Sequence, residues 1–183
     1  RMSEMFSRRV FLRGLGVVAA AAALTACSST NEAVNQALIE GAVGGIVAAD
    51  CKIGRMTYWA ANATVPVYEI SFRIVMTNVS SKPVTLSGDN FATTLDGTPI
   101  PPFNFSARDV GDADIWRTYD SLTIRPGEER SVALAYEISQ PTYDSWYKSS
   151  RTVAVSFTCG NQRVTYTKNS RSDEITVSDI ETL

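Results

Sequence analysis

The chain has 183 residues, with 17 lysines and arginines against 19 aspartates and glutamates, and it contains no histidine. Without histidine the chain lacks the commonest general base and the commonest metal ligand, so the composition disfavours an enzyme and predicts neither a metal site nor another cofactor. No basic stripe accompanies the slightly acidic net charge of −2, which argues against a nucleic-acid partner.

The first segment of the chain, residues 1–26, has the organisation of a secretory signal peptide. Basic residues precede an uncharged stretch, residues 14–26, in which small residues dominate. A membrane-spanning helix needs about 20 predominantly apolar residues, so this stretch is too short to remain as a span. A basic region, a short apolar region and a small-residue boundary are typical of an export signal that is removed.

Two motifs specify the kind of signal. The sequence SRRVFLR, with Arg8 and Arg9, resembles a twin-arginine signal, which exports folded proteins. The sequence LTAC, ending at Cys27, resembles a bacterial lipobox. The resemblance implies that the mature chain begins at Cys27, that acyl chains on Cys27 anchor it to a membrane, and that it lies in the cell envelope on the extracytoplasmic face.

Residues 27–49 show a helical pattern. Ser29 and Glu32 have the spacing of a capping box, and apolar residues recur every four positions up to Ala42 and Ile46. The pattern predicts a short N-terminal helix, which acts either as a stalk near the membrane or as a helix folded back on the domain. Because several glycines follow Glu40, the helix is expected to weaken near that residue.

From residue 50 the apolar period changes to two, which is typical of half-buried strands. The best alternation covers residues 68–76, 131–138 and 153–159, and Gly160-Asn161 predicts a hairpin turn into residues 164–166. Shorter candidate strands cover residues 56–59, 84–86, 91–95 and 122–124. About seven short strands predict an all-β fold, an antiparallel immunoglobulin-like β-sandwich over residues 50–168. The remaining residues, 169–183, form either a polar tail or an added edge strand.

Cysteine usage fits an oxidising exterior. With Cys27 assigned to lipidation, Cys51 and Cys159 remain and are expected to form a disulfide that closes a long loop. The alternative is that both are small buried apolar residues.

A family resemblance rests on three stretches, YEISFRIVMTNVSSKP, NFATTLDGTPI and LTIRPGEERSVALAYEIS. They are similar to immunoglobulin-like domains of unknown function in bacterial lipoproteins, where a strand ending in Asn precedes a Ser/Lys/Pro turn. The resemblance covers roughly residues 50–168 and implies the fold. It supplies no catalytic residues.

Two aromatic segments are candidates for binding a partner. Residues 101–120 form the longest irregular stretch, and residues 139–150 join two strong strands. Exposed aromatic side chains are good anchors for a protein or a glycan, and the alternative is that they cap one end of the sandwich. The candidates are Phe103, Phe105, Trp116, Tyr119, Tyr143 and Trp146. Trp59 is expected in the core.

Evidence for catalysis is weak, because no G-x-S-x-G elbow occurs and no histidine is present to activate a serine. Asp109, Asp112 and Asp114 fit a solvated acidic loop better than a calcium site. The sequence therefore favours a non-enzymatic, surface-anchored binding module. The alternative is a structural accessory subunit of a cell-envelope complex, and an enzyme comes third.

Overall fold

Two long adjacent strands establish the architecture. In the computed structural model, which describes residues 41–111 and 115–183, β1 (Ile46–Tyr58) pairs antiparallel with β2 (Val67–Asn78) along their whole lengths. Arg8, Arg9, Cys27 and most of the expected N-terminal helix lie outside the described residues. The burial of β2 alternates as the sequence predicts, because Ile70, Phe72 and Ile74 face the core and their neighbours face outward.

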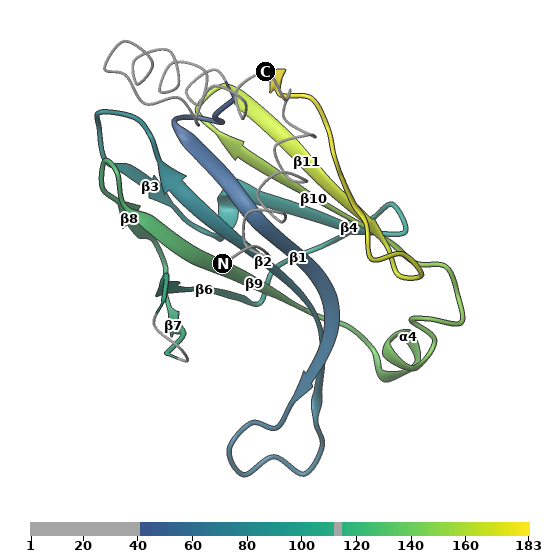
Figure 1. Cartoon of the computed structure of the whole chain (residues 1–183). Coiled ribbons are helices and arrows are strands. Elements are labelled where there is room, and N and C mark those ends of the chain that lie inside the picture. Colours follow the sequence, from purple (N-terminus) through teal and green to yellow (C-terminus); the bar gives the residue numbers. More distant parts are fainter. Residues whose placement is uncertain (1–40, 112–114) are drawn as a thin grey trace.

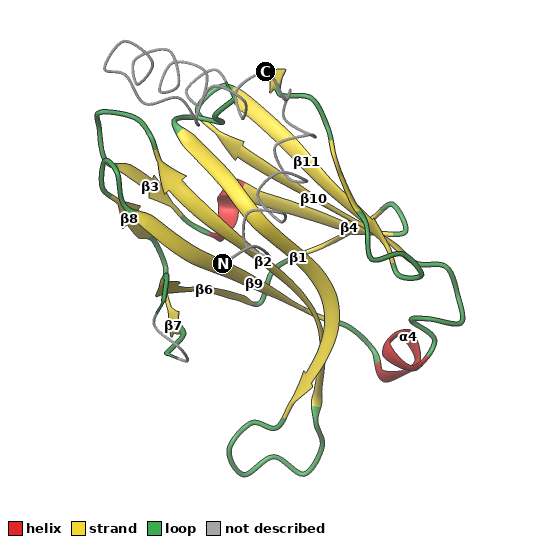
Figure 2. Cartoon of the chain, in the orientation of Figure 1, coloured by secondary structure: helices red, strands yellow, loops and turns green. Residues whose placement is uncertain are grey.

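The first sheet has five strands in the order β1-β2-β9-β6-β7 (Figures 1 and 2). Strand β9 is Glu129–Glu137, β6 is Asn104–Asp109 and β7 is Arg117–Thr118. The second sheet follows the order β12-β11-β10-β4-β5, and β13 adds to β11. Its strands are β4 (Phe91–Leu95), β5 (Thr98–Ile100), β10 (Thr152–Cys159), β11 (Gln162–Asn169), β12 (Ile175–Val177) and β13 (Glu181–Thr182).

Three smaller elements complete the described chain. Strands β3 (Val84–Leu86) and β8 (Leu122–Ile124) form a separate two-stranded ladder, and the 3-10 helix η1 (Gly88–Asn90) leads into β4. A one-turn helix, α4 (Gln140–Asp144), lies in the crossover from β9 to β10. This crossover carries the chain from the first sheet to the second.

The inner faces of the two sheets meet in one hydrophobic core. Aromatic rings connect them, since Phe72 of β2 lies 6.0 Å from Phe91 of β4 and 5.8 Å from Tyr166 of β11. The predicted antiparallel β-sandwich is therefore confirmed. It has more strands than the seven expected, because β5, β6, β7, β12 and β13 are short or weakly patterned.

The sandwich extends beyond both ends of the predicted range, residues 50–168. Ala42 and Ile46, expected on the N-terminal helix, are instead buried just before the Val43–Ile46 bridge and at the start of β1, so the sheet begins before residue 50. At the other end, β12 and β13 pair with β11, so the edge-strand interpretation of residues 169–183 is the right one.

A buried asparagine closes the end of the sandwich near the β2–β3 turn. Asn78 is fully buried, and its side-chain amide donates to Lys82 O at 2.8 Å and Ile124 O at 2.9 Å. Its Oδ1 accepts from the backbone N–H and the hydroxyl of Ser80, at 2.9 and 2.7 Å. One side chain thus satisfies the polar groups where β2, β3 and β8 meet, which explains why this strand ends in Asn before a Ser/Lys/Pro turn.

The expected disulfide is absent, because Cys51 and Cys159 are both free thiols. Cys51 interacts electrostatically with Tyr166 and Lys168 of β11, whereas the Cys159 thiol donates to the carbonyl of Gly44 at 3.8 Å. The two thiols therefore have different neighbours in the fold and are not bonded to each other.

Candidate functional site

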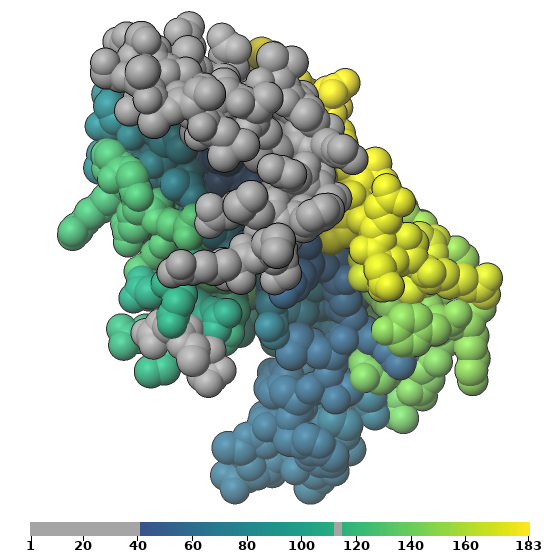
Figure 3. Space-filling model, viewed as in Figure 1, coloured from purple at the N-terminus to yellow at the C-terminus, as the bar shows by residue number. Residues whose placement is uncertain are grey.

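The tip of the β1–β2 hairpin projects beyond the rest of the sandwich. Pairing continues to Tyr58 and Val67, and residues 58–67, here called the hairpin tip, extend past the other strands at the lower end of Figures 1 and 3. Trp59 is 64% exposed and Val65 67% exposed, and Tyr58 is also exposed. The expectation that Trp59 belongs to the core is wrong, because the hairpin is longer than the core that it borders.

An arginine is stacked between tyrosines near the base of the hairpin tip. The Arg55 guanidinium lies 4.2 Å from the ring centroid of Tyr143 and 4.7 Å from that of Tyr147. Tyr68 of β2 packs against Tyr143 with 5.1 Å between centroids. These four residues are called the crossover cluster. Cation–π contacts of this kind contribute about 0.5–1 kcal/mol each at exposed sites, so they hold the crossover against the hairpin.

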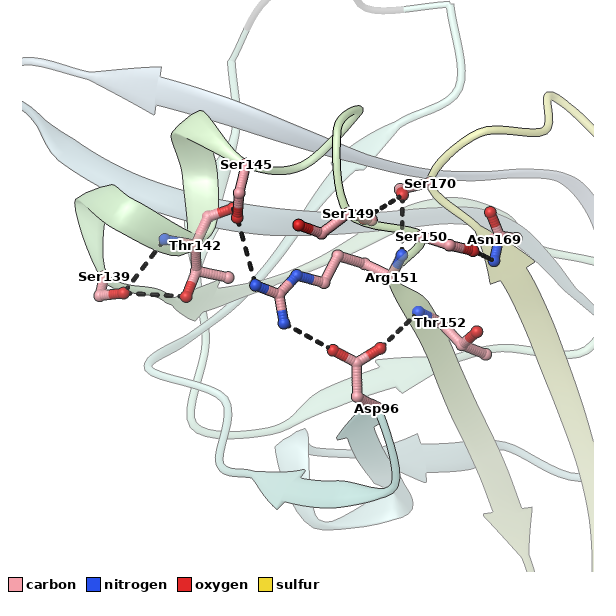
Figure 4. Close-up of polar contacts among 10 residues, drawn as sticks. All are labelled: Asp96, Ser139, Thr142, Ser145, Ser149, Ser150, Arg151, Thr152, Asn169 and Ser170. Carbon is pink, nitrogen blue, oxygen red and sulfur yellow. Dashed lines mark hydrogen bonds and ion pairs between the residues drawn. The ribbon is translucent and has the colours of Figure 1, made fainter.

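The crossover is also held by polar contacts, drawn in Figure 4. Arg151 donates to Asp96 Oδ2 at 2.9 Å and to the Ser145 hydroxyl at 3.2 Å. The backbone N–H of Thr152 donates to Asp96 Oδ1 at 2.8 Å. The hydrogen bond from Arg151 and that from Thr152 lower the pKa of Asp96 below its ordinary value. The β4–β5 turn is thereby tied to the last turn of the crossover.

The aromatic residues of the crossover were expected either to bind a partner or to cap one end of the sandwich, and the structure places some in each group. Trp146 is only 2% exposed and belongs to the core, so it caps the sandwich and offers no surface to a partner. Tyr143 is half-buried in the crossover cluster, and Tyr147 is 61% exposed.

A second stacked group lies on the outer face of the first sheet. The ring centroid of Trp116 is 5.5 Å from the Arg73 guanidinium carbon and 4.9 Å from that of Arg108. Arg73 and Arg108 project outward because their neighbours Phe72 and Ala107 are buried in the core. These three residues are called the sheet-face cluster.

The remaining aromatic residues of 101–120 also differ from one another in burial. Phe105 lies on β6 with 6% exposure and is a core residue, which corrects its assignment to a partner surface. Tyr119 is half-buried and packs against the core. Phe103 is 42% exposed, and its backbone N–H donates to Ala135 O at 2.9 Å. The stretch expected to be irregular therefore contains β6 and β7.

Like charges face each other on the same outer surface. Glu69 of β2 is paired in register with Glu137 of β9, and directly opposed like charges destabilise a sheet. Burial raises the pKa of the Glu69 carboxyl, and the nearby Arg73 acts in the opposite direction. Burial likewise raises the pKa of the Cys51 thiol, which disfavours its reactive thiolate form.

Within residues 41–111 and 115–183, no group of three or more Cys, Asp or Glu side chains is arranged to hold a metal ion. Asp109 forms an ion pair with Arg130, and Asp112 and Asp114 lie outside the described residues. No helix in the described part of the chain is long and apolar enough to cross a membrane.

Comparisons with known proteins give similarity to solved structures alone. No protein-family model and no curated protein shows a significant match. The chain is similar to an uncharacterized β-sandwich protein from Clostridium difficile, with 15% identity over 68% of this chain and 83% of the other, at a TM-score of 0.40. The yjhA protein from Bacillus subtilis matches with 16% identity, 62% and 73% coverage, and a TM-score of 0.38. A protein from Archaeoglobus fulgidus matches with 12% identity, 73% and 94% coverage, and a TM-score of 0.32.

The arginines of both clusters were missed by sequence reasoning. Arg73 stands at an outward position of the clearest strand pattern, which signals exposure. That Trp116 stacks on it depends on the pairing of β2, β9 and β6, which brings residues distant in sequence to one face.

Proposed function

We propose that this chain is a lipid-anchored, non-enzymatic binding module on the extracytoplasmic face of a membrane, and that the sheet-face cluster is its partner-binding surface. The twin-arginine and lipobox motifs support the anchorage. The observation that carries the binding role is a tryptophan ring positioned between two guanidinium groups on the outer face of a sheet. Trp and Arg, with Tyr, are the residues that dominate the binding energy of protein interfaces.

The surroundings of the cluster suit a protein partner. Ser131 and Ala133 of β9 lie between the arginine-bearing strands and are small and buried, so they add little to the exposed surface there. The two stacked guanidiniums hold the ring of Trp116, and an aromatic side chain already held in place loses little entropy on binding. The guanidinium groups also favour carboxylates, so the partner surface is expected to be acidic at this point.

The test is a cross-linking pull-down from native membranes with the full chain. Trp116→Ala is expected to lower the recovery of the partner at least about tenfold, because hot-spot residues cost more than 1–2 kcal/mol when truncated. Arg125→Ala, which changes an exposed arginine in the β8–β9 turn, is the matched control and should leave recovery unchanged.

The result also separates the two functions that the sequence favours. A partner recovered in equal amounts with the anchored chain would indicate an accessory subunit of an envelope complex. Equal recovery with wild type and Trp116→Ala would exclude this surface, and turnover of an ester, peptide or glycan substrate by the purified chain would contradict a non-enzymatic role.

A further inference from the structure

The hairpin tip remains unexplained by the proposed partner surface. Between Arg55 and Glu69 the sequence contains no charged residue, although this stretch includes the most projecting part of the described chain. Its large exposed side chains are Tyr58, Trp59 and Val65. Isolated exposed apolar side chains are ordinary, but three on one projecting turn form a contact surface.

We propose that the hairpin tip inserts into the headgroup interface of the membrane to which the chain is anchored. This proposal rests on the anchorage included in the proposed function. Tyrosine and tryptophan prefer the membrane–water interface, because their rings are apolar and their polar groups remain hydrated. An uncharged tip avoids the cost of bringing an ionised group into that layer.

The irregular backbone of the tip favours a position in the headgroup layer of the membrane over a deeper one in the hydrocarbon layer. Residues 59–66 form a turn, with Ala63 N–H donating to Ala60 O at 3.0 Å and Asn62 in the left-handed region at φ 65°. Turn backbone leaves other polar groups unpaired, and these cannot enter the hydrocarbon layer without a large cost. At headgroup depth they remain hydrated while the three side chains contact lipid.

A membrane surface also fits a single projecting turn better than a protein partner does. A protein interface buries about 800 Å² on each partner, which requires a broader surface than one turn.

The distances allow the anchor and the tip to contact one membrane. Strand β1 has 13 residues and is about 43 Å long, and the described chain begins at the end opposite the tip. Residues 27–40 would span about 21 Å as a helix and at most about 50 Å extended. An extended linker of this length exceeds the length of β1, so the anchor and the tip can reach the same membrane.

The experiment uses the full lipidated chain reconstituted in phosphatidylcholine–phosphatidylglycerol vesicles, with and without lipids brominated on the acyl chains. The chain has three tryptophans, Trp59, Trp116 and Trp146, so fluorescence quenching by bromine reports which ring approaches the lipid. We expect Trp59→Phe to abolish at least about half of the quenching, and the matched control Trp116→Phe to leave it in place. Vesicles should also protect Trp59 from aqueous iodide.

The outcomes separate this proposal from the proposed function. Flotation of the wild-type chain with vesicles, combined with quenching that Trp59→Phe does not change, would overturn the tip proposal and leave the anchor intact. A wild-type chain that fails to float would overturn both anchorage and tip insertion. Protection of Trp59 only after a glycan or a protein is added would overturn the lipid assignment.

Discussion

The two ends of the β1–β2 hairpin differ in the burial and hydrogen bonding of their side chains. At one end the fully buried Asn78 makes four side-chain hydrogen bonds, and the chain packs closely beside it. At the other end Tyr58 and Trp59 are exposed and no charged residue accompanies them. The same pair of strands therefore has one end that stabilises the fold and one end that is free to make contacts.

This difference predicts that substitutions at the first end reduce stability and that substitutions at the second reduce binding. The largest effect is expected at Asn78. Asn78→Ala removes four hydrogen bonds and leaves the carbonyl of the buried Ile124 without this donor, which should lower the free energy of unfolding by roughly 3 kcal/mol. Urea unfolding measures the change, and Asn161→Ala, at an exposed turn position, is the control. Equal stability of the two variants would show that Asn78 does not hold this end together.

A smaller loss is expected at Gly44, near the start of β1. Its φ is +58°, and a Cβ added there would lie 2.4 Å from Cys159 Sγ. Gly44→Ala should cost roughly 2 kcal/mol through the contact and the backbone conformation together. Gly54→Ala, where an added Cβ meets nothing within 4 Å, is the matched control.

Adding Cys159→Gly should recover part of the loss caused by Gly44→Ala, because it removes the two side-chain atoms nearest the new methyl group. If Gly44→Ala costs as much in the Cys159→Gly background as in the wild type, the close contact with Cys159 is not the cause.

The third prediction concerns acid stability. The pKa of Asp96 is lowered in the folded chain, so its contribution is present above its ordinary pKa of 3.8 and is lost as the pH falls through the folded value. Asp96→Asn should therefore lower stability at pH 7 by less than about 1 kcal/mol, because the ion pair is solvent-accessible. Below pH 4 the variant and the wild type should converge. Thermal unfolding from pH 7 to pH 2 tests this, with the exposed Asp173→Asn as control; a constant difference across that range would contradict it.

The fold could be predicted from the sequence wherever a strand has a clear apolar–polar alternation. Strands β2, β9 and β10 alternate clearly between apolar and polar residues, so their positions and the sandwich follow from local pattern. Strand β1 was not predicted before residue 56, because a bulge interrupts its alternation: the register shifts between Ala49 and Lys52, and Asp50 has φ 49°. Strand β6 was missed because only Phe105 and Ala107 mark its inner face.

The candidate sites were less predictable, because exposure depends on where each strand ends relative to the core. The hydrophobicity of Trp59 predicts a position in the core, yet the residue lies past the end of the core and is exposed. Phe105 and Trp116 are eleven positions apart in one stretch, but strand register turns the first inward and stacks the second on outward arginines. The expected disulfide was also wrong, since the spacing of cysteines in a sequence does not show which neighbours each thiol has in the fold.

The smallest effect on stability is expected at the hairpin tip. Trp59→Ser should change the free energy of unfolding by less than about 0.5 kcal/mol, because the ring is mostly exposed and packs little in the folded chain. A near-zero change in urea unfolding would show that the fold does not depend on this ring, as the exposed position predicts. A loss of 2 kcal/mol or more would instead place Trp59 among the residues that stabilise the fold, and the contrast between the two ends of the hairpin would disappear.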